Sequence, residues 1–189
     1  EWDPDPVRRG KALLGDRGAV AASMPHLPGL HDLMTLFDGK LEGATYFMVD
    51  HPELIEEYRE RQERLLLACL ERALDEKPDY IEFSNSGLLT LSNPRWVREL
   101  AMPTLAKATR LCREAGIPSE LHCCGKELQV MEMCAEMTEL DSINPLQPPP
   151  MGDCRLDECK RRFGKRFCLK GNVGVTNPML LDGPDDVEK

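Results

Sequence analysis

The residues of this chain best suited to chemistry lie in the short stretch Leu121-His122-Cys123-Cys124-Gly125. If this stretch is a β-strand, residues two apart point to the same side, so His122 and Cys124 lie together. An imidazole nitrogen and a thiolate sulfur both suit Zn²⁺, and a zinc ion with an open coordination position can bind and ionise a substrate thiol. The stretch therefore predicts a metal site at His122 and Cys124.

The same residues also fit a site without a metal. A histidine at the end of a strand can simply be held by a hydrogen bond, and cysteine is among the residue types most often buried in a core. Two ligands do not complete a zinc site, so from the spacing alone this second interpretation is the stronger. Cys69, Cys112 and Cys134 fall among apolar helical positions, where we expect them to be core residues.

Further polar residues follow the predicted strands: Glu82, Ser84, Asn85, Asn144, Gln147, Lys170 and Asn172. Glu82 lies on an otherwise apolar strand, where burial without a partner or a function would be costly, and we expect it to be catalytic. Asn85, Asn144 and Asn172 are expected to bind a cofactor. The remaining histidines, His26, His31 and His51, lie near a loop or a helix start, where capping and solvent exposure explain them.

The elements that must position these residues alternate along the chain. Short apolar or β-branched runs predict strands over residues 19–24, 79–84, 119–123, 140–146 and 167–170. Helical periodicity predicts helices between them, the clearest opening at Asp50-His51-Pro52 and stopping at Lys77-Pro78, with Pro103 kinking the next one. This order predicts βαβ units and a parallel sheet, which binds ligands at the carboxyl ends of its strands.

Composition excludes several classes of function. The chain has 189 residues, 41% of them hydrophobic, and a net charge of -9, so it can bury a core but offers no basic surface for nucleic acid. No apolar run approaches the roughly 20 residues that span a bilayer, and the start of the chain does not resemble a signal peptide. We therefore expect a cytoplasmic protein whose eight cysteines are reduced thiols.

Taken together, several motifs resemble the uroporphyrinogen decarboxylase superfamily, and especially its cobalamin-dependent, zinc-containing methyltransferase branch. The resemblance runs from roughly Gly18 to the end. The motifs are Asp50-His51-Pro52-Glu53, Asp79-Tyr80-Ile81-Glu82-Phe83, Leu91-Ser92-Asn93-Pro94, His122-Cys123-Cys124-Gly125, and Leu169-Lys170-Gly171-Asn172-Val173 before Pro178 and Leu180-Leu181. The arginine-rich motif and the pyrrole-binding aspartate of the decarboxylase branch are absent from this sequence.

The resemblance implies a TIM (β/α)8 barrel. Residues 1–189 would form a single partial barrel domain, lacking the first strands and the last, and an open barrel edge would favour self-association. In the methyltransferase branch a His-x-Cys pair and a later cysteine hold zinc. His122 and Cys124 match the pair, and the later cysteine would fall beyond Lys189.

The resemblance also implies a reaction. The leading hypothesis is zinc-dependent methyl transfer between a corrinoid such as methylcobalamin, carried by a partner protein, and a thiol. Two alternatives stay open: decarboxylation of uroporphyrinogen, a tetrapyrrole, without a metal, and a non-catalytic module that binds a corrinoid or a tetrapyrrole. A fold alone does not decide among these functions.

Overall fold

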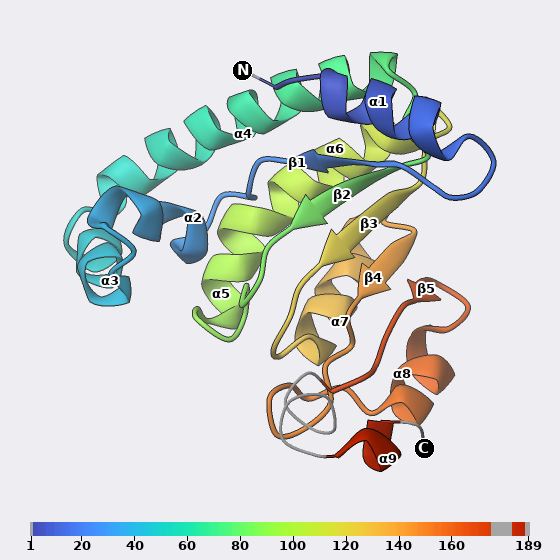
Figure 1. Cartoon of the computed structure of the whole chain (residues 1–189). Coiled ribbons are helices and arrows are strands. Elements are labelled where there is room, and N and C mark those ends of the chain that lie inside the picture. Colours follow the sequence, from blue (N-terminus) through green and yellow to red (C-terminus); the bar gives the residue numbers. More distant parts are fainter. Residues whose placement is uncertain (1, 175–182, 188–189) are drawn as a thin grey trace.

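The computed structural model describes residues 2–174 and 183–187 and shows strands alternating with helices (Figure 1). The strands are β1 (Ala21–Met24), β2 (Tyr80–Ser84), β3 (Ser119–His122), β4 (Ser142–Asn144) and β5 (Cys168–Leu169). They pair in chain order as a five-stranded sheet, and each pairing is parallel. The predicted α/β class with a parallel sheet is confirmed, and a closed barrel stays a prediction.

Helices lie before the first strand, between the strands and after the last one. They are α1 (Asp5–Leu14), α2 (Leu30–Met34), the 3-10 helix η1 (Thr35–Phe37), α3 (Leu41–Asp50), α4 (Pro52–Asp75), α5 (Pro94–Trp96), the π-helix η2 (Val97–Ala101), α6 (Met102–Glu114), α7 (Leu128–Met137), α8 (Leu156–Phe163) and α9 (Pro184–Val187). None of the described helices is long and apolar enough to cross a membrane. The helices predicted between the strands are all present.

One face of the sheet is apolar and packs against helices. Ile81 and Phe83 of β2, Leu121 of β3 and Ile143 of β4 are all fully buried. Helices α4, α6 and α7 lie behind this face in Figure 1. Since successive strand residues point to opposite sides, the alternate residues lie on the other face, which no described helix covers in this view.

A second, smaller core lies at one end of the molecule. Leu30 and Leu33 of α2 pack there with Ala44 and Met48 of α3 and with Ile55 of α4. In Figure 1, α2 and α3 lie side by side next to the first turns of α4, away from β5. The sequence analysis predicted the helix that contains Ile55 but assigned α2 and α3 to no element.

Local sequence explains where the elements begin and end. The Asn93 side chain accepts a hydrogen bond from the Trp96 backbone nitrogen at 3.0 Å and so caps the start of α5. The segment from α5 to α6 is helical throughout and contains its π-turn just before Pro103. Strand β4 ends before Pro145, because proline cannot donate to the ladder, so it is shorter than the predicted 140–146.

Candidate functional site

The uncovered face of the sheet carries polar side chains in two levels. Ser23, Glu82, Glu120 and Ser142 are neighbours across β1, β2, β3 and β4. One level nearer the carboxyl ends, Ser84, His122 and Asn144 are neighbours across β2, β3 and β4. The predicted residues Glu82, His122 and Asn144 therefore share one face.

His122 is held in a defined orientation by Asn144. The Nδ1 of His122 lies 2.6 Å from the Oδ1 of Asn144. An amide oxygen only accepts, so Nδ1 carries a proton, and Nε2 is the ring nitrogen whose lone pair a metal can take. This is the arrangement of a histidine that binds a metal, whose second ring nitrogen donates to a fixed acceptor.

Cys124 lies just beyond the end of β3. Leu121 and Cys123 are both fully buried, whereas His122 and Cys124 are half-exposed, so the strand alternation continues through Cys124. The backbone nitrogens of Asn85 and Gly87 donate to the carbonyl oxygens of His122 and Cys124, at 2.8 and 3.0 Å. The loop after β2 therefore holds the backbone of His122 and Cys124 in place.

These two side chains offer half of a zinc site. Among the residues that the structure describes, no group of three or more His, Cys, Asp or Glu side chains could together hold a metal ion. A tetrahedral zinc has four ligands, so His122 and Cys124 would need two further ligands. Their donor chemistry and the free Nε2 of His122 fit that ion.

An ion pair between a buried carboxylate, Glu120, and a largely exposed lysine, Lys170, lies one level below. Lys170 Nζ is 2.6 Å from Glu120 Oε1, and Ser142 Oγ donates to Glu120 Oε2 at 2.8 Å. The hydrogen bond to Glu120 raises the pKa of Lys170, whose ammonium group also lies 5.7 Å from the Tyr80 ring centre. The sequence analysis named Lys170 and missed Glu120. Like Glu82, Glu120 is a carboxylate within a predicted strand, so the same argument would have identified it.

The other two predicted cofactor residues make different contacts. The Asn85 side chain is fully buried, and its Oδ1 accepts from the Leu27 backbone nitrogen at 2.9 Å, so it fastens the loop after β1 to the end of β2. Its Nδ2 has no hydrogen-bond partner. Asn172 is half-exposed. The residue before it, Gly171, packs against the carbonyl group of Pro145, which directly follows Asn144. The structure therefore joins Asn144, but not Asn85, to the His122 side chain.

A buried acid braces the loop that carries Cys124. Glu127 is fully buried, and its Oε2 accepts from the Gln147 backbone nitrogen at 2.9 Å, while the Gln147 side chain accepts from the Gly125 nitrogen at 2.9 Å. Burial raises the pKa of Glu127 to about 8. Its Oε1 has no partner, which suits a protonated carboxyl group in an apolar setting. The sequence analysis did not identify Glu127.

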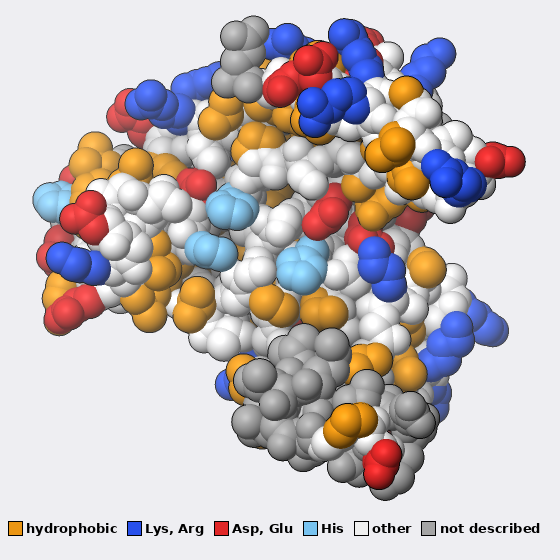
Figure 2. Space-filling model, viewed as in Figure 1, with side chains coloured by type: hydrophobic (Ala, Val, Ile, Leu, Met, Phe, Trp, Pro, Cys, Tyr) orange, Lys and Arg blue, Asp and Glu red, His pale blue; other side chains and the backbone are white. Residues whose placement is uncertain are grey.

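Histidines from the loop after β1 approach the same end of the sheet. The rings of His26 and His31 stack with their centres 5.0 Å apart, and His31 Nδ1 lies 2.7 Å from the Ser86 carbonyl oxygen. Histidine side chains gather near the middle of the uncovered face (Figure 2). The sequence analysis explained these residues by capping and exposure, because only the fold shows that the segment after β1, with His26 in its loop and His31 in α2, lies near the end of β2.

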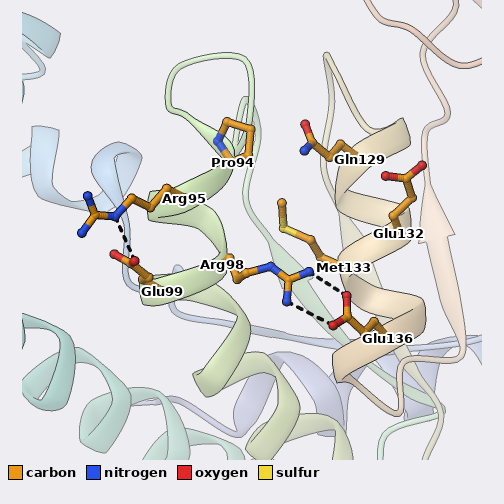
Figure 3. A pocket seen from close by; sticks show the side chains of 8 residues that line it. All are labelled: Pro94, Arg95, Arg98, Glu99, Gln129, Glu132, Met133 and Glu136. Atoms are coloured by element: carbon orange, nitrogen blue, oxygen red, sulfur yellow. Dashed lines mark hydrogen bonds and ion pairs between the residues drawn. The ribbon is translucent and has the colours of Figure 1, made fainter.

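A groove between α5, η2 and α7 holds charged side chains that are already paired (Figure 3). Arg98 bonds Glu136 through both nitrogens at 2.6 and 3.2 Å, and Arg95 bonds Glu99 at 2.9 Å. Each of these two guanidinium groups thus has a carboxylate partner within the groove. We therefore assign this groove no functional role.

The fold and this face define an α/β protein with a parallel sheet and a polar surface at the carboxyl ends of its strands. Comparisons with models of known protein families and with curated proteins find no match to this chain.

Proposed function

We propose that this protein transfers a methyl group between a corrinoid and a thiol, with zinc held by His122 and Cys124. The observation that carries the proposal is the 2.6 Å contact from His122 Nδ1 to Asn144 Oδ1, which leaves Nε2 as the ring nitrogen that can bind a metal. The motif resemblance supports it, and with it a partial TIM barrel in a cytoplasmic protein. The parallel sheet with helices behind one face is compatible with such a barrel.

The chain's own residues would bind and orient the acceptor. Asn144 keeps the His122 ring in one tautomer and one orientation, so the metal ligand needs no rearrangement when substrate arrives. Glu82 stands one level below on the uncovered face and would contact the substrate body. Zinc, when bound there, would lower the pKa of the acceptor thiol so that its sulfur binds as a thiolate.

The corrinoid would come from outside the chain, as methylcobalamin or on a carrier protein. Methyl transfer forms a carbon–sulfur bond and leaves the electron pair of the carbon–cobalt bond on the corrinoid. The corrinoid would approach the uncovered face at the carboxyl ends of the strands, where His122 stands. Asn172, beyond β5, would contact the corrinoid at the rim.

The charges on this face favour methyl transfer over decarboxylation. The five described strands contain no lysine or arginine, and the nearest ammonium group, on Lys170, is bonded to Glu120. A polycarboxylate porphyrinogen would need several cationic partners, as carboxylates bound in proteins usually have. A thiol and a corrinoid can bind without several cationic partners.

One assay separates the three functions. The protein is incubated with methylcobalamin and a panel of thiols, and separately with uroporphyrinogen, before and after zinc removal. We expect thiol-dependent demethylation of methylcobalamin that is lost with zinc and restored on its return. Zinc-independent loss of carboxylates from uroporphyrinogen, without demethylation, would show that the protein is a decarboxylase. Inactivity in both arms would favour a binding module.

A further inference from the structure

A pocket of about 520 Å³ lies between α2, η1, α3 and α4, outside the site described above. Its walls include Leu36 of η1, Phe47 of α3, and Leu54 and Leu65 of α4. Its volume falls within the range of small-molecule sites, which are mostly apolar with a few fixed polar groups. The pocket is therefore large enough for a ligand of modest size.

The apolar walls of this pocket are unusually exposed. Leu36, Leu54 and Leu65 expose 72%, 42% and 48% of their surface, and they are three of the eleven large hydrophobic residues that are exposed in the described part of the chain. Exposed leucines are ordinary when they are scattered singly. Their convergence on one hollow indicates that an apolar group covers them.

The polar group of the pocket is the Asp32 carboxylate. Its side chain is 16% exposed, its Oδ2 accepts from the Tyr58 hydroxyl at 2.7 Å, and its Oδ1 accepts from Gln62 Nε2 at 3.1 Å. Both donors are neutral. His26 Nδ1 is 4.0 Å from Oδ1, where it forms an ion pair only when the ring is protonated. Burial raises the pKa of Asp32 even with His26 and His31 nearby, so the carboxylate gains from a permanent cation bonded to it.

The remaining charges leave the pocket negative. Glu57 and Arg61 stand on α4 among the lining residues, so two carboxylates face one guanidinium. A partly buried carboxylate is stabilised most by a cation that also hydrogen-bonds to it. An ammonium group joined to an apolar tail would satisfy Asp32 and cover the leucines at once.

We propose that this pocket binds a small amphipathic amine, with its ammonium group on Asp32 and its apolar tail against Leu36, Leu54 and Leu65. The site is independent of the proposed methyl transfer. Its ligand class follows from the charge of Asp32 and from the exposed walls, which together call for a cationic head and a short hydrocarbon or aryl tail.

The test uses hexylamine as the probe, with hexan-1-ol and hexanoate as partners of equal tail length. Binding to the protein at pH 7 is measured by calorimetry and by NMR amide shifts. We expect hexylamine to bind about tenfold more tightly than hexan-1-ol, and hexanoate to bind more weakly still. Each methylene group from butylamine to hexylamine should strengthen binding by about fourfold.

Two variants and one control locate the probe. Asp32→Asn should reduce the preference for amine over alcohol to within about twofold, and Leu36→Ser should weaken amine and alcohol alike. Leu36 is exposed, so its replacement leaves the fold intact. The control is Asp38→Asn, an exposed left-handed position outside the pocket, which asparagine tolerates.

The proposal is overturned if the three hexyl probes bind equally or not at all. It is also overturned if Asp32→Asn and Asp38→Asn, both folded by circular dichroism, keep the same preference for the amine. Amide shifts on strands β2 and β3 in place of α2 and α4 would likewise contradict it.

Discussion

The Nδ1 of His122 and the Oδ1 of Asn144 lie 2.6 Å apart, on neighbouring strands and at the same level of the sheet. The bond is side chain to side chain, so replacing Asn144 changes the histidine and leaves the backbone ladder in place. It makes Asn144 the support of the proposed metal ligand.

The first prediction concerns this support. Asn144→Ala should weaken zinc binding by about tenfold to a hundredfold, because His122 loses the acceptor that fixes its ring and tautomer. Asn144→Asp keeps an acceptor and should keep the affinity. Zinc affinity is measured by competition with a chelator of known strength. Ser142→Ala, on the same strand and bonded to Glu120, is the matched control. Equal affinity in Asn144→Ala and wild type would show that the bond has no role in metal binding.

The second prediction concerns Glu127 and pH. Its pKa in the folded protein, about 8, lies above the ordinary value of 4.5, so the folded state favours the protonated form. The resulting stabilisation is complete below about pH 4.5 and is lost as the pH rises toward 8, by at most about 1.4 kcal/mol for each pH unit. Glu127→Gln cannot ionise. It should therefore gain stability relative to wild type as the pH rises.

Urea unfolding at pH 5 and at pH 8.5 checks this prediction. Glu114→Gln removes the same charge from an exposed position at the end of α6 and serves as the control. A stability difference between Glu127→Gln and wild type that is the same at both pH values would mean that Glu127 is ionised throughout.

The third prediction concerns the turn after Cys124. Gly125 has a φ of 98°, and an added Cβ would lie 2.1 Å from Thr90 Oγ1. Gly125→Ala should therefore combine backbone strain with a collision and cost about 2–4 kcal/mol of unfolding free energy. Gly39→Ala is the comparison, because its φ is 75° and nothing lies within 4 Å of the added Cβ. It should cost only about 1 kcal/mol. Equal costs, measured by urea unfolding, would contradict the crowding at Thr90.

The sequence predicted the sheet well because its signals are local. Tyr80–Ser84 is apolar at alternate positions and β-branched or aromatic, and it follows the helix stop at Lys77-Pro78. The long helix α4 is amphipathic over its whole length and starts at Pro52, as predicted. Cys69, Cys112 and Cys134 are buried in the core, as their helical positions indicated.

The first fifty residues were harder because their helices are stabilised by tertiary contacts. Helix α1 buries only Val7, and α2 has five residues, so neither shows a full apolar stripe. Helix α3 is stabilised by the packing of Ala44 and Met48 against α2 and α4. Sequence periodicity detects a face that is wholly apolar, and these helices lack one.

The site shows the same division. His122 and Cys124 were found from a spacing of two, and Asn144 from its place at a strand end, but the bond between His122 and Asn144 depends on strand register. Glu127 and Asp32 were missed because their chemistry comes from burial and from partners distant in sequence. Sequence reasoning predicts that a carboxylate in a polar stretch is exposed to solvent, and only the tertiary structure shows that it is buried.

X-ray absorption at the zinc edge tests the central claim most directly, that His122 and Cys124 bind zinc. The zinc-loaded protein should show a nitrogen ligand at about 2.0 Å and a sulfur ligand at about 2.3 Å. Cys124→Ser should remove a sulfur from the spectrum and His122→Ala a nitrogen, whereas Cys168→Ser, at the exposed cysteine of β5, should change neither. A protein that binds no zinc, or a zinc spectrum untouched by both site variants, would contradict the account.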